Sequence, residues 1–402
     1  MQMKLQERVI LHCDANNFFA SVETIINPDC KNMPVAVTGN PKKRTGIVLA
    51  KNELAKSYGV KTGDTIGEAK MKCPNLVCLP PNMPIYEQYS QKLQNIYYEY
   101  TDQIEAFGID ECWLDITDSL NYLNKSPKEI ADELRSRVKN ELNLTISVGI
   151  SFCKLFAKLA SDMKKPDATT EITKQDFKKI LYPLELTEII GIGRRLKIKF
   201  NKFNVFKLGD IITIDDEILK AKFGKVGIEI KNALLGYQCD PVINNSPIPK
   251  SVGNGTTTIR DITSRDEIKS VVIYLSEMIA RRLREKSIYT ACIHISVKTC
   301  NFKRDGHEKH LKYNTNNASD IAKEAMNVLD NFWRYDEKIR AIRVSCGSIS
   351  KNFYEQTSLF SSIQIKNNSI LNDTIDKILN KYGTTALQPA VLLTSDYINR
   401  KS

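Results

Sequence analysis

The stretch from Ile104 to Thr117 constrains the fold and chemistry of this chain more than any other. β-Favouring residues on both sides of Gly108 and Asp110 predict a β-hairpin with its turn at those two residues. Asp110 and Glu111 are adjacent at the bend, where both side chains can face one point, unlike neighbours on a regular strand. Because adjacent carboxylates repel, this pair costs free energy unless a positive group lies between them. The pattern indicates a divalent-cation site, with a solvated acidic turn as the alternative.

Length and charge indicate several compact units and a polyanionic partner. A chain of 402 residues is too long for one ordinary core, so two to four units are expected. The net charge of +11 suggests nucleic acid or an anionic membrane surface. No run approaches the roughly 18 apolar residues of a spanning helix, and the N-terminus lacks the pattern of a signal peptide. We therefore expect a cytoplasmic protein that does not enter a membrane.

The cysteines and histidines are not spaced as metal ligands. Ten cysteines are scattered without a C-x-x-C pair, which predicts reduced thiols, several of them in core positions. The four histidines show no partner spacing, and His307 and His310 fall in what reads as a polar loop. The sequence therefore predicts no structural zinc site.

Strands and helices alternate through residues 1–166. Val9–Cys13 is a continuous apolar run, which is typical of a strand buried on both faces. It ends at Asp14, just before a predicted helix from Phe18. An acidic residue there suits a cation bound under a phosphate, although Asp14 or Asn16 could instead cap the helix. We expect one sheet with helices, and a small insertion at 31–78.

Two glycine turns follow in a basic helical segment. They are Gly191-Ile192-Gly193, followed by two arginines, and Gly224-Lys225-Val226-Gly227. In a helix-hairpin-helix, such turns let backbone N–H groups approach a phosphate while the next helix adds its positive end. Ordinary helix caps are the alternative.

The remainder reads as a linker, a small α/β domain and a polar tail. Residues 240–250 are rich in Pro and Asn. Strands are expected near 251–260, 290–299 and 340–349, and helices near 265–286 and 318–331. The basic cluster in the first of these helices marks a charged side of the domain or a solvated face. The tail after 350 is expected to be irregular, apart from an amphipathic helix near 369–381.

Three motifs together resemble a known family. Cys13-Asp14-Ala15-Asn16-Asn17-Phe18-Phe19, Gly108-Ile109-Asp110-Glu111, and Val148-Gly149-Ile150-Ser151 followed by Lys164-Lys165-Pro166 resemble the Y-family (translesion) DNA polymerases. The bacterial UmuC-like/DinB-like branch is most similar. The resemblance runs from about residue 8 to 360 in family order. Gly108 stands where a serine is usual, and Cys112 and Trp113 stand where smaller or phenyl residues are common, which leaves the fine geometry open.

The resemblance implies an α+β multidomain fold shaped as a right hand. The palm (a mixed sheet plus helices) would comprise residues 1–17 and 79–170, and small fingers residues 18–78. A helical helix-hairpin-helix thumb would follow at 171–239, then the linker 240–250 and an α/β little finger at 251–350. The tail at 351–402 would carry a clamp-binding peptide, and the protein would act as a monomer.

It also implies roles for individual residues. Asp14 and Asp110 would bridge two Mg²⁺ ions, Glu111 would hold the ion at the primer 3′-hydroxyl, and the Ala15 carbonyl would complete the other site. Phe18 and Phe19 would contact the incoming nucleotide, with Phe19 as a steric gate against ribose, and Lys56 and Lys165 would contact the triphosphate; core packing and solvated lysines are the alternatives. Primer–template DNA would contact Gly191, Gly193, Arg194, Arg195, Lys225 and Gly227. A sliding clamp would bind Gln356, Leu359 and Phe360, although a match this short could arise by chance.

The implied activity is template-directed, low-fidelity addition of deoxynucleotides during lesion bypass. Two alternatives remain at this point. A nucleotidyl cyclase can share a palm-like sheet and two-metal chemistry, but the helix-hairpin-helix segment and the charge argue against it. A non-catalytic DNA-binding repair factor would leave the three carboxylates without a role.

Overall fold

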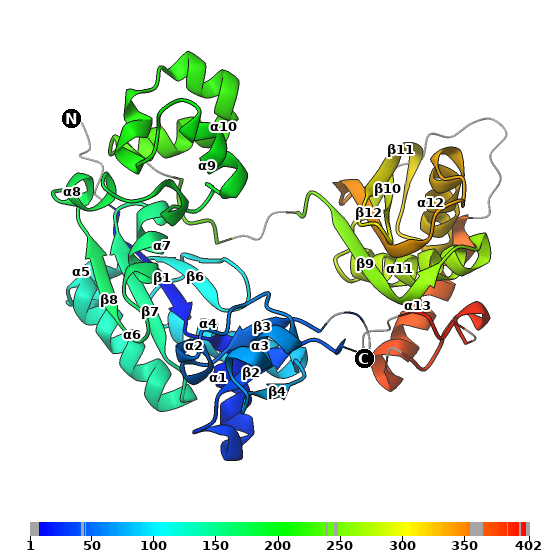
Figure 1. Cartoon of the computed structure of the whole chain (residues 1–402), viewed down its shortest axis with the longest axis horizontal. Helices are drawn as coiled ribbons and strands as arrows, with labels where there is room; N and C mark the ends of the chain where they lie inside the picture. Colours follow the sequence, from blue (N-terminus) through cyan, green and yellow to red (C-terminus); the bar gives the residue numbers. More distant parts are fainter. Residues whose placement is uncertain are drawn as a thin grey trace. The chain divides into compact units, whose positions relative to one another are not determined.

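The computed structural model describes residues 8–41, 44, 46–237, 240–244, 248–353, 365–383, 385–393 and 395–398. The chain divides into two compact units, Met1–Gly39 with Ile47–Ser246, and Asn40–Gly46 with Pro247–Ser402 (Figure 1). Each unit has its own apolar core. The finer division into palm, fingers, thumb, linker, little finger and tail stays a prediction.

The first unit is built on a five-stranded sheet in the order β5-β6-β1-β7-β8. Its strands are β5 (Ile104–Ala106), β6 (Glu111–Asp115), β1 (Ile10–Ala15), β7 (Ile146–Ser151) and β8 (Thr169–Ile172). β1 pairs antiparallel with both β6 and β7, and β7 pairs parallel with β8. All six residues of β1 are buried, as the apolar run predicts for a central strand covered on both faces.

Different helices cover the two faces of this sheet. One face packs on α1 (Phe18–Ile26), α4 (Met83–Tyr98) and α6 (Pro127–Leu142) through the largest core of this unit. The opposite face is crossed by α7 (Lys154–Met163), whose Ala157 packs on Ile10 and Trp113. α5 (Ser119–Leu123) follows β6. Since residues alternate along a strand, His12 and Asp14 lie on the α7 side and Leu11 and Cys13 on the other.

A smaller sheet and a helical segment complete the first unit. The sheet order is β3-β2-β4, with β2 (Val35–Thr38), β3 (Val48–Lys51), β4 (Val77–Leu79), the 3₁₀ turn η1 (Pro28–Cys30), α2 (Glu53–Ser57) and α3 (Ile66–Lys72). The helical segment contains α8 (Phe177–Leu181), η3 (Leu186–Glu188), α9 (Arg194–Asn201), η4 (Leu208–Thr213) and α10 (Asp216–Leu234). Gly224 interrupts α10 with non-helical backbone angles.

The second unit is a four-stranded antiparallel sheet with two long helices on one face. The sheet order is β11-β10-β12-β9, with β9 (Val252–Ile262), β10 (Tyr289–Thr299), β11 (Arg304–Thr315) and β12 (Ile339–Ser350). Helices α11 (Arg265–Glu285) and α12 (Ala318–Phe332) pack on Ile293, Ile295 and Val297 of β10. α13 (Ile365–Tyr382) and η5 (Ala390–Leu392) follow.

Two sequence-based expectations are wrong in detail. The polar loop predicted around His307 and His310 is β11, a strand in which a run of exposed residues hides the usual alternation. The cysteines are not all reduced, because Cys153 is disulfide-bonded. The amphipathic helix predicted near 369–381 corresponds to α13. Among the helices that the structure describes, none combines the length and the apolar character needed to cross a bilayer.

Candidate active site

Three acidic residues from two neighbouring strands meet at one cavity. Asp14, near the end of β1, is opposite Glu111, the first residue of β6. Ala15 N donates to the Asp110 carbonyl with a 3.0 Å N···O distance, which fixes the turn against the strand. All three acidic side chains line a cavity of about 280 Å³. The structure thus brings together residues that are 96 positions apart, as their placement on central neighbouring strands predicts.

Two lysines from α7 and the residues after it balance these carboxylates. Lys158 Nζ lies 2.7 Å from Glu111 Oε2 and 3.1 Å from Asp14 Oδ2, so one ammonium group bridges two acidic residues. Lys165 Nζ lies 2.7 Å from Asp14 Oδ2 and 2.8 Å from Asp162 Oδ1. The resemblance names Lys165 but not Lys158. The signal that could have found Lys158 is its spacing from Asp162, since residues four apart share one face of a helix.

A buried histidine, His12, contacts Glu111 of the acidic cluster. Its ring is fully buried, with Nδ1 2.9 Å from Ser161 Oγ and Nε2 3.3 Å from Glu111 Oε2. Burial lowers the pKa of His12 and outweighs the raising effect of Glu111, which favours the neutral ring. Trp113 packs edge-on against this ring, with centroids 5.2 Å apart. We infer that His12 positions Glu111, a role that a histidine inside an apolar strand does not signal in the sequence.

Burial and mutual repulsion separate the proton affinities of Asp110 and Glu111. Burial, then the charges of Glu111 and Asp14, raise the pKa of Asp110 to about 6. Burial would also raise the pKa of Glu111, but His12 and Lys158 outweigh it and lower that pKa to about 2. Negative charge therefore accumulates around Asp110, which, unlike Asp14 and Glu111, forms no ion pair with a lysine among the described residues. A cation placed there would relieve this repulsion.

The opposite side of the cavity has an aromatic and a basic wall. Phe18 and Phe19 both line it. The Phe19 ring stacks on Tyr86 with centroids 4.4 Å apart and an interplanar angle of 14°, and Tyr86 in turn donates to Glu23 over 2.5 Å. Phe18 is buried at 2% exposure, so Phe19 is the ring that is better placed to meet a ligand.

Of the nearby lysines of the small sheet, Lys51 lines the cavity and Lys56 does not. Lys56 is half-exposed and its Nζ lies 3.3 Å from Glu53 Oε1. Burial, followed by the charge of Lys56, lowers the pKa of Lys51, so the two ammonium groups act on the same region. The triphosphate contact assigned to Lys56 stays a prediction, and Lys51 is a residue that the sequence reasoning missed.

Comparison with known proteins decides the family. The family model described as "impB/mucB/samB family" matches residues 13–162. The model described as "impB/mucB/samB family C-terminal domain" matches residues 249–359. Together these ranges span more than half of the chain. The chain belongs to the impB/mucB/samB family.

Relatives of this impB/mucB/samB protein are DNA polymerases. DNA polymerase IV of Acetivibrio thermocellus is 39% identical over 398 residues, covering 98% of this chain and 100% of that relative. DNA polymerase IV 1 of Bacillus subtilis is 32% identical over 394 residues, covering 97% of this chain and 94% of that relative. The solved structure of the Y-family DNA polymerase chimera Dbh-Dpo4(243-245)-Dbh has 25% identity and a TM-score of 0.75, covering 86% of this chain and all of that chain.

These findings confirm the main sequence-based predictions for the impB/mucB/samB protein. It is a Y-family translesion DNA polymerase with the predicted α+β multidomain fold, and the DNA polymerase IV relatives favour the DinB-like branch. Neither the nucleotidyl cyclase nor the non-catalytic repair factor finds support in the comparisons. Family membership fits a divalent metal at the acidic cavity.

The two departures from the family pattern have local explanations in this impB/mucB/samB protein. Gly108 has a φ of 96°, a left-handed conformation that glycine adopts without strain. A Cβ there would lie 3.6 Å from Asp110 Oδ1, so the glycine also leaves space beside that carboxylate. Trp113 donates from Nε1 to the Lys154 carbonyl over 3.0 Å and thereby ties β6 to the start of α7.

The two glycine turns of the impB/mucB/samB protein lie side by side. A Cβ on Gly191 would lie 3.5 Å from Val226 Cγ1, so the first turn packs on the second. Gly193 precedes α9, whose first residues Arg194 and Arg195 are exposed. Lys225 is exposed and pairs with Glu229 at 3.1 Å, and Gly227 packs closely on Phe223. The arrangement presents two arginines at a helix start, but the predicted DNA contacts stay predictions.

Proposed function

We propose that Asp14, Asp110 and Glu111 are the catalytic residues with which this Y-family polymerase adds deoxynucleotides to a primer end opposite a template. The observation that carries this proposal is the convergence of the three carboxylates on one cavity with an aromatic and a basic wall. Primer extension with single deoxynucleotides, on templates that differ only at the templating base, tests it. Addition should follow base pairing on an undamaged template and continue, less selectively, past a damaged base. Addition that ignores the template would refute the proposal.

The donor set fits Mg²⁺, a hard cation that takes oxygen ligands. Glu111 Oε2 is buried, and among the described residues no hydrogen bond of good geometry satisfies it, although Lys158 Nζ is only 2.7 Å away. Asp14, Asp110 and Glu111, with the Ala15 carbonyl, would hold two ions. When bound, the ions would activate the primer 3′-hydroxyl and neutralise charge that develops on the phosphates.

The side chains around the carboxylates have separate tasks in this proposal. Lys165 and Lys51, with Lys56 further out, would place positive charge beside the triphosphate and the departing pyrophosphate. Ser161 and His12 hold Glu111 in place from the α7 side. The Phe19 ring, fixed by its stack on Tyr86, would lie under the sugar of the incoming nucleotide.

Replacing Lys158 with Gln should strengthen Mg²⁺ binding. The ammonium group competes with the ions for Asp14 and Glu111 and repels any cation placed between them. We expect the Mg²⁺ concentration that half-saturates thermal stabilisation of the DNA-free protein to fall about tenfold. Lys139→Gln is the matched control, because Lys139 pairs with Asp167 away from the cavity. An unchanged or higher half-saturation in Lys158→Gln would show that the ammonium does not occupy the cation's place.

Replacing Phe19 with Ala should increase ribonucleotide incorporation. Loss of the ring leaves room for a 2′-hydroxyl that the stacked phenyl group would exclude. We expect the preference for dNTP over rNTP, measured as a ratio of kcat/KM values, to fall by about 100-fold. Phe107→Ala serves as a control, because Phe107 contacts Trp113 and does not line the cavity. Unchanged sugar discrimination in Phe19→Ala would assign this residue to packing alone.

Primer–template DNA is the polyanionic partner in this proposal. The exposed turn with Gly191, Gly193, Arg194 and Arg195, and the turn with Lys225 and Gly227, would contact the phosphate backbone. In the second unit, Lys298, Arg304 and Arg343 line a groove of about 410 Å³ on the sheet face away from α11 and α12. This face would provide a second set of backbone contacts.

The remaining expectations concern partners and location. The clamp-binding peptide with Gln356, Leu359 and Phe360 lies outside the described residues, so docking on a sliding clamp stays a prediction. A monomeric state and a cytoplasmic location are likewise proposed from the family alone. Co-elution of the full chain with a purified bacterial sliding clamp, and its loss in Leu359→Ala with Phe360→Ala, tests the clamp contact.

A further inference from the structure

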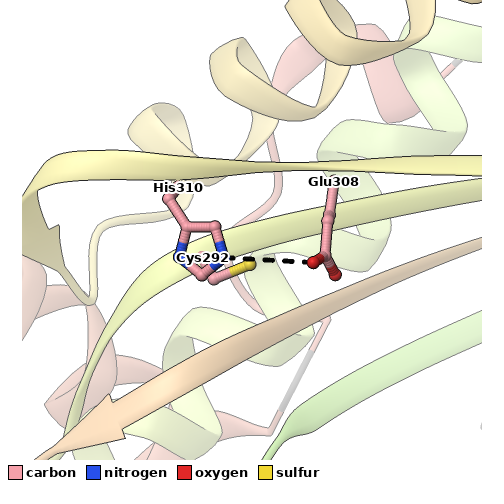
Figure 2. A group of neighbouring side chains, drawn as sticks. All are labelled: Cys292, Glu308 and His310. Atoms are coloured by element: carbon pink, nitrogen blue, oxygen red, sulfur yellow. Dashed lines mark ion pairs between the residues drawn. The ribbon is translucent and has the colours of Figure 1, made fainter.

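Three metal-binding side chains come together on the second unit, far in sequence from the active-site carboxylates. Cys292 on β10 is directly opposite His310 on β11 in the antiparallel register. Glu308 is two residues before His310 on the same strand, so its side chain is on the same face. Figure 2 shows the imidazole, the thiol and the carboxylate gathered between these strands.

Their donor atoms are already close. One donor atom of each residue, sulfur, nitrogen or oxygen, lies within 4.8 Å of the other two. His310 Nε2 lies 3.9 Å from Glu308 Oε1, a distance that allows an ion pair when the imidazole is protonated. In a tetrahedral zinc site the donor atoms are about 3.5 Å apart, given bonds of about 2.0–2.3 Å to the metal. The glutamate and histidine side chains are exposed, so small rotations about their side-chain bonds close the remaining gap of about 1 Å.

The thiol is held still while its partners can move. Cys292 is buried at 6% exposure, between β11 on one side and Gly347 of β12 on the other. A Cβ on Gly347 would lie 3.9 Å from Cys292 Sγ. Because Gly347 has no side chain, this position of β12 places no side-chain atom against the sulfur. Burial, and then the charge of Glu308, raise the pKa of Cys292, so the metal-free site holds a thiol. The neighbouring His294 is turned toward Ser345, 3.4 Å from its Nδ1, and stands outside the group.

We propose that Cys292, Glu308 and His310 form a binding site for one zinc-class divalent cation, with water as the fourth ligand. Thiolate, imidazole and carboxylate are the ligands that zinc takes in proteins, whereas Mg²⁺ prefers oxygen alone. As the metal–sulfur bond forms, the thiol proton passes to solvent, as does the Nε2 proton of any protonated imidazole, and the carboxylate oxygen and the neutral ring nitrogen bind the metal. The site is separate from the carboxylate cluster of the first unit and does not depend on the proposed catalytic roles.

The absence of a zinc motif in the sequence is consistent with this site. Cys292 and His310 are 18 positions apart and are brought together by the pairing of β10 with β11. A site built across two strands leaves only the i, i+2 spacing of Glu308 and His310 as a local signal, and that spacing is common in exposed strands. Interpreting the residues around His307 and His310 as a polar loop, where the structure has β11, removes even this signal.

Cobalt substitution of the full reduced chain tests the proposal. Co²⁺ bound through sulfur gives a near-ultraviolet thiolate-to-metal charge-transfer band, which an oxygen-only site in the first unit cannot give. We expect this band to saturate at one Co²⁺ per chain and to disappear in Cys292→Ser. Competition with a chromophoric chelator should show Zn²⁺ affinity reduced at least 100-fold in His310→Ala and about tenfold in Glu308→Gln, since even outer partners of a metal contribute 10–100-fold.

Two control variants test whether loss of metal binding is specific to the three proposed ligands. Cys300→Ser removes another partly exposed thiol of the second unit, and His307→Ala removes a histidine of the same strand that faces Phe332 on the other side. Both should bind Co²⁺ and Zn²⁺ as the unchanged chain does. The proposal is overturned if the unchanged chain gives no charge-transfer band. It is equally overturned if Cys292→Ser keeps the band, or if Glu308→Gln and His310→Ala bind Zn²⁺ with unaltered affinity.

Discussion

Replacing Asp110 with Asn is expected to reduce primer extension by about 10³-fold or more while primer–template affinity stays within about threefold. The amide keeps the shape of the side chain but removes the negative charge with which the residue would hold a cation. Metal ions supply several kcal/mol of transition-state stabilisation, and each 1.36 kcal/mol is a factor of ten in rate. Single-turnover primer extension, with DNA affinity measured by fluorescence anisotropy, separates the two effects.

Glu111→Gln should behave in the same way, since Glu111 lines the same cavity and its charge is fixed by Lys158 and His12. Asp102→Asn is the matched control, an exposed carboxylate on the approach to the same hairpin. It should leave extension unchanged. Full activity in Asp110→Asn or Glu111→Gln would show that these carboxylates are not catalytic, whether or not the variants bind DNA.

Replacing Gly149 with Ala should lower the stability of the first unit. Gly149 is on β7, directly under α7, where a Cβ would lie 1.9 Å from the Ala157 carbonyl oxygen and 2.4 Å from Ser161 N. Both atoms belong to helix backbone, so they cannot rotate away and α7 must shift. We expect the free energy of unfolding to fall by about 3 kcal/mol, a loss of about 6–12 °C in Tm for a unit of this size.

The same change should disturb the active site, because α7 carries Lys158 and Ser161. Gly67→Ala is the contrasting control: Gly67 is in the exposed helix α3 with no atom within 4 Å of the added methyl group. That substitution should stabilise the protein by about 0.5–1 kcal/mol. Thermal unfolding followed by circular dichroism measures both. A Tm for Gly149→Ala equal to that of the unchanged chain would mean that α7 does not pack on β7 as described.

The sequence predicts the site residues that belong to short, contiguous motifs. Asp14 ends an apolar run and Asp110 with Glu111 lies in a hairpin turn, so local pattern places each on a strand end. Central strands then bring these ends together. Lys158 and His12 were missed because they act through packing: one is a lysine within a helix and the other a histidine within a buried strand.

The prediction of a loop in place of β11 and the omission of Lys51 also arise because packing, and not a local pattern, decides these features. β11 carries polar residues on both faces, since its inner face meets α12 through the Lys309–Glu324 and His307–Phe332 contacts. A strand of that kind has no period-2 signal. Lys51 ends β3 and Lys56 is five positions later in α2, and only the fold shows which of the two lines the cavity.

The count of metal ions in the complex with primer–template and an incoming nucleotide tests the central claim most directly. Mn²⁺ takes the same oxygen ligands as Mg²⁺ and can be counted by electron paramagnetic resonance. In a Cys292→Ser background with a dideoxy-terminated primer, the chain should bind two Mn²⁺ ions per complex. Asp14→Asn in that background should bind at most one. Two tightly bound ions in Asp14→Asn would contradict the shared carboxylate site on which the account depends.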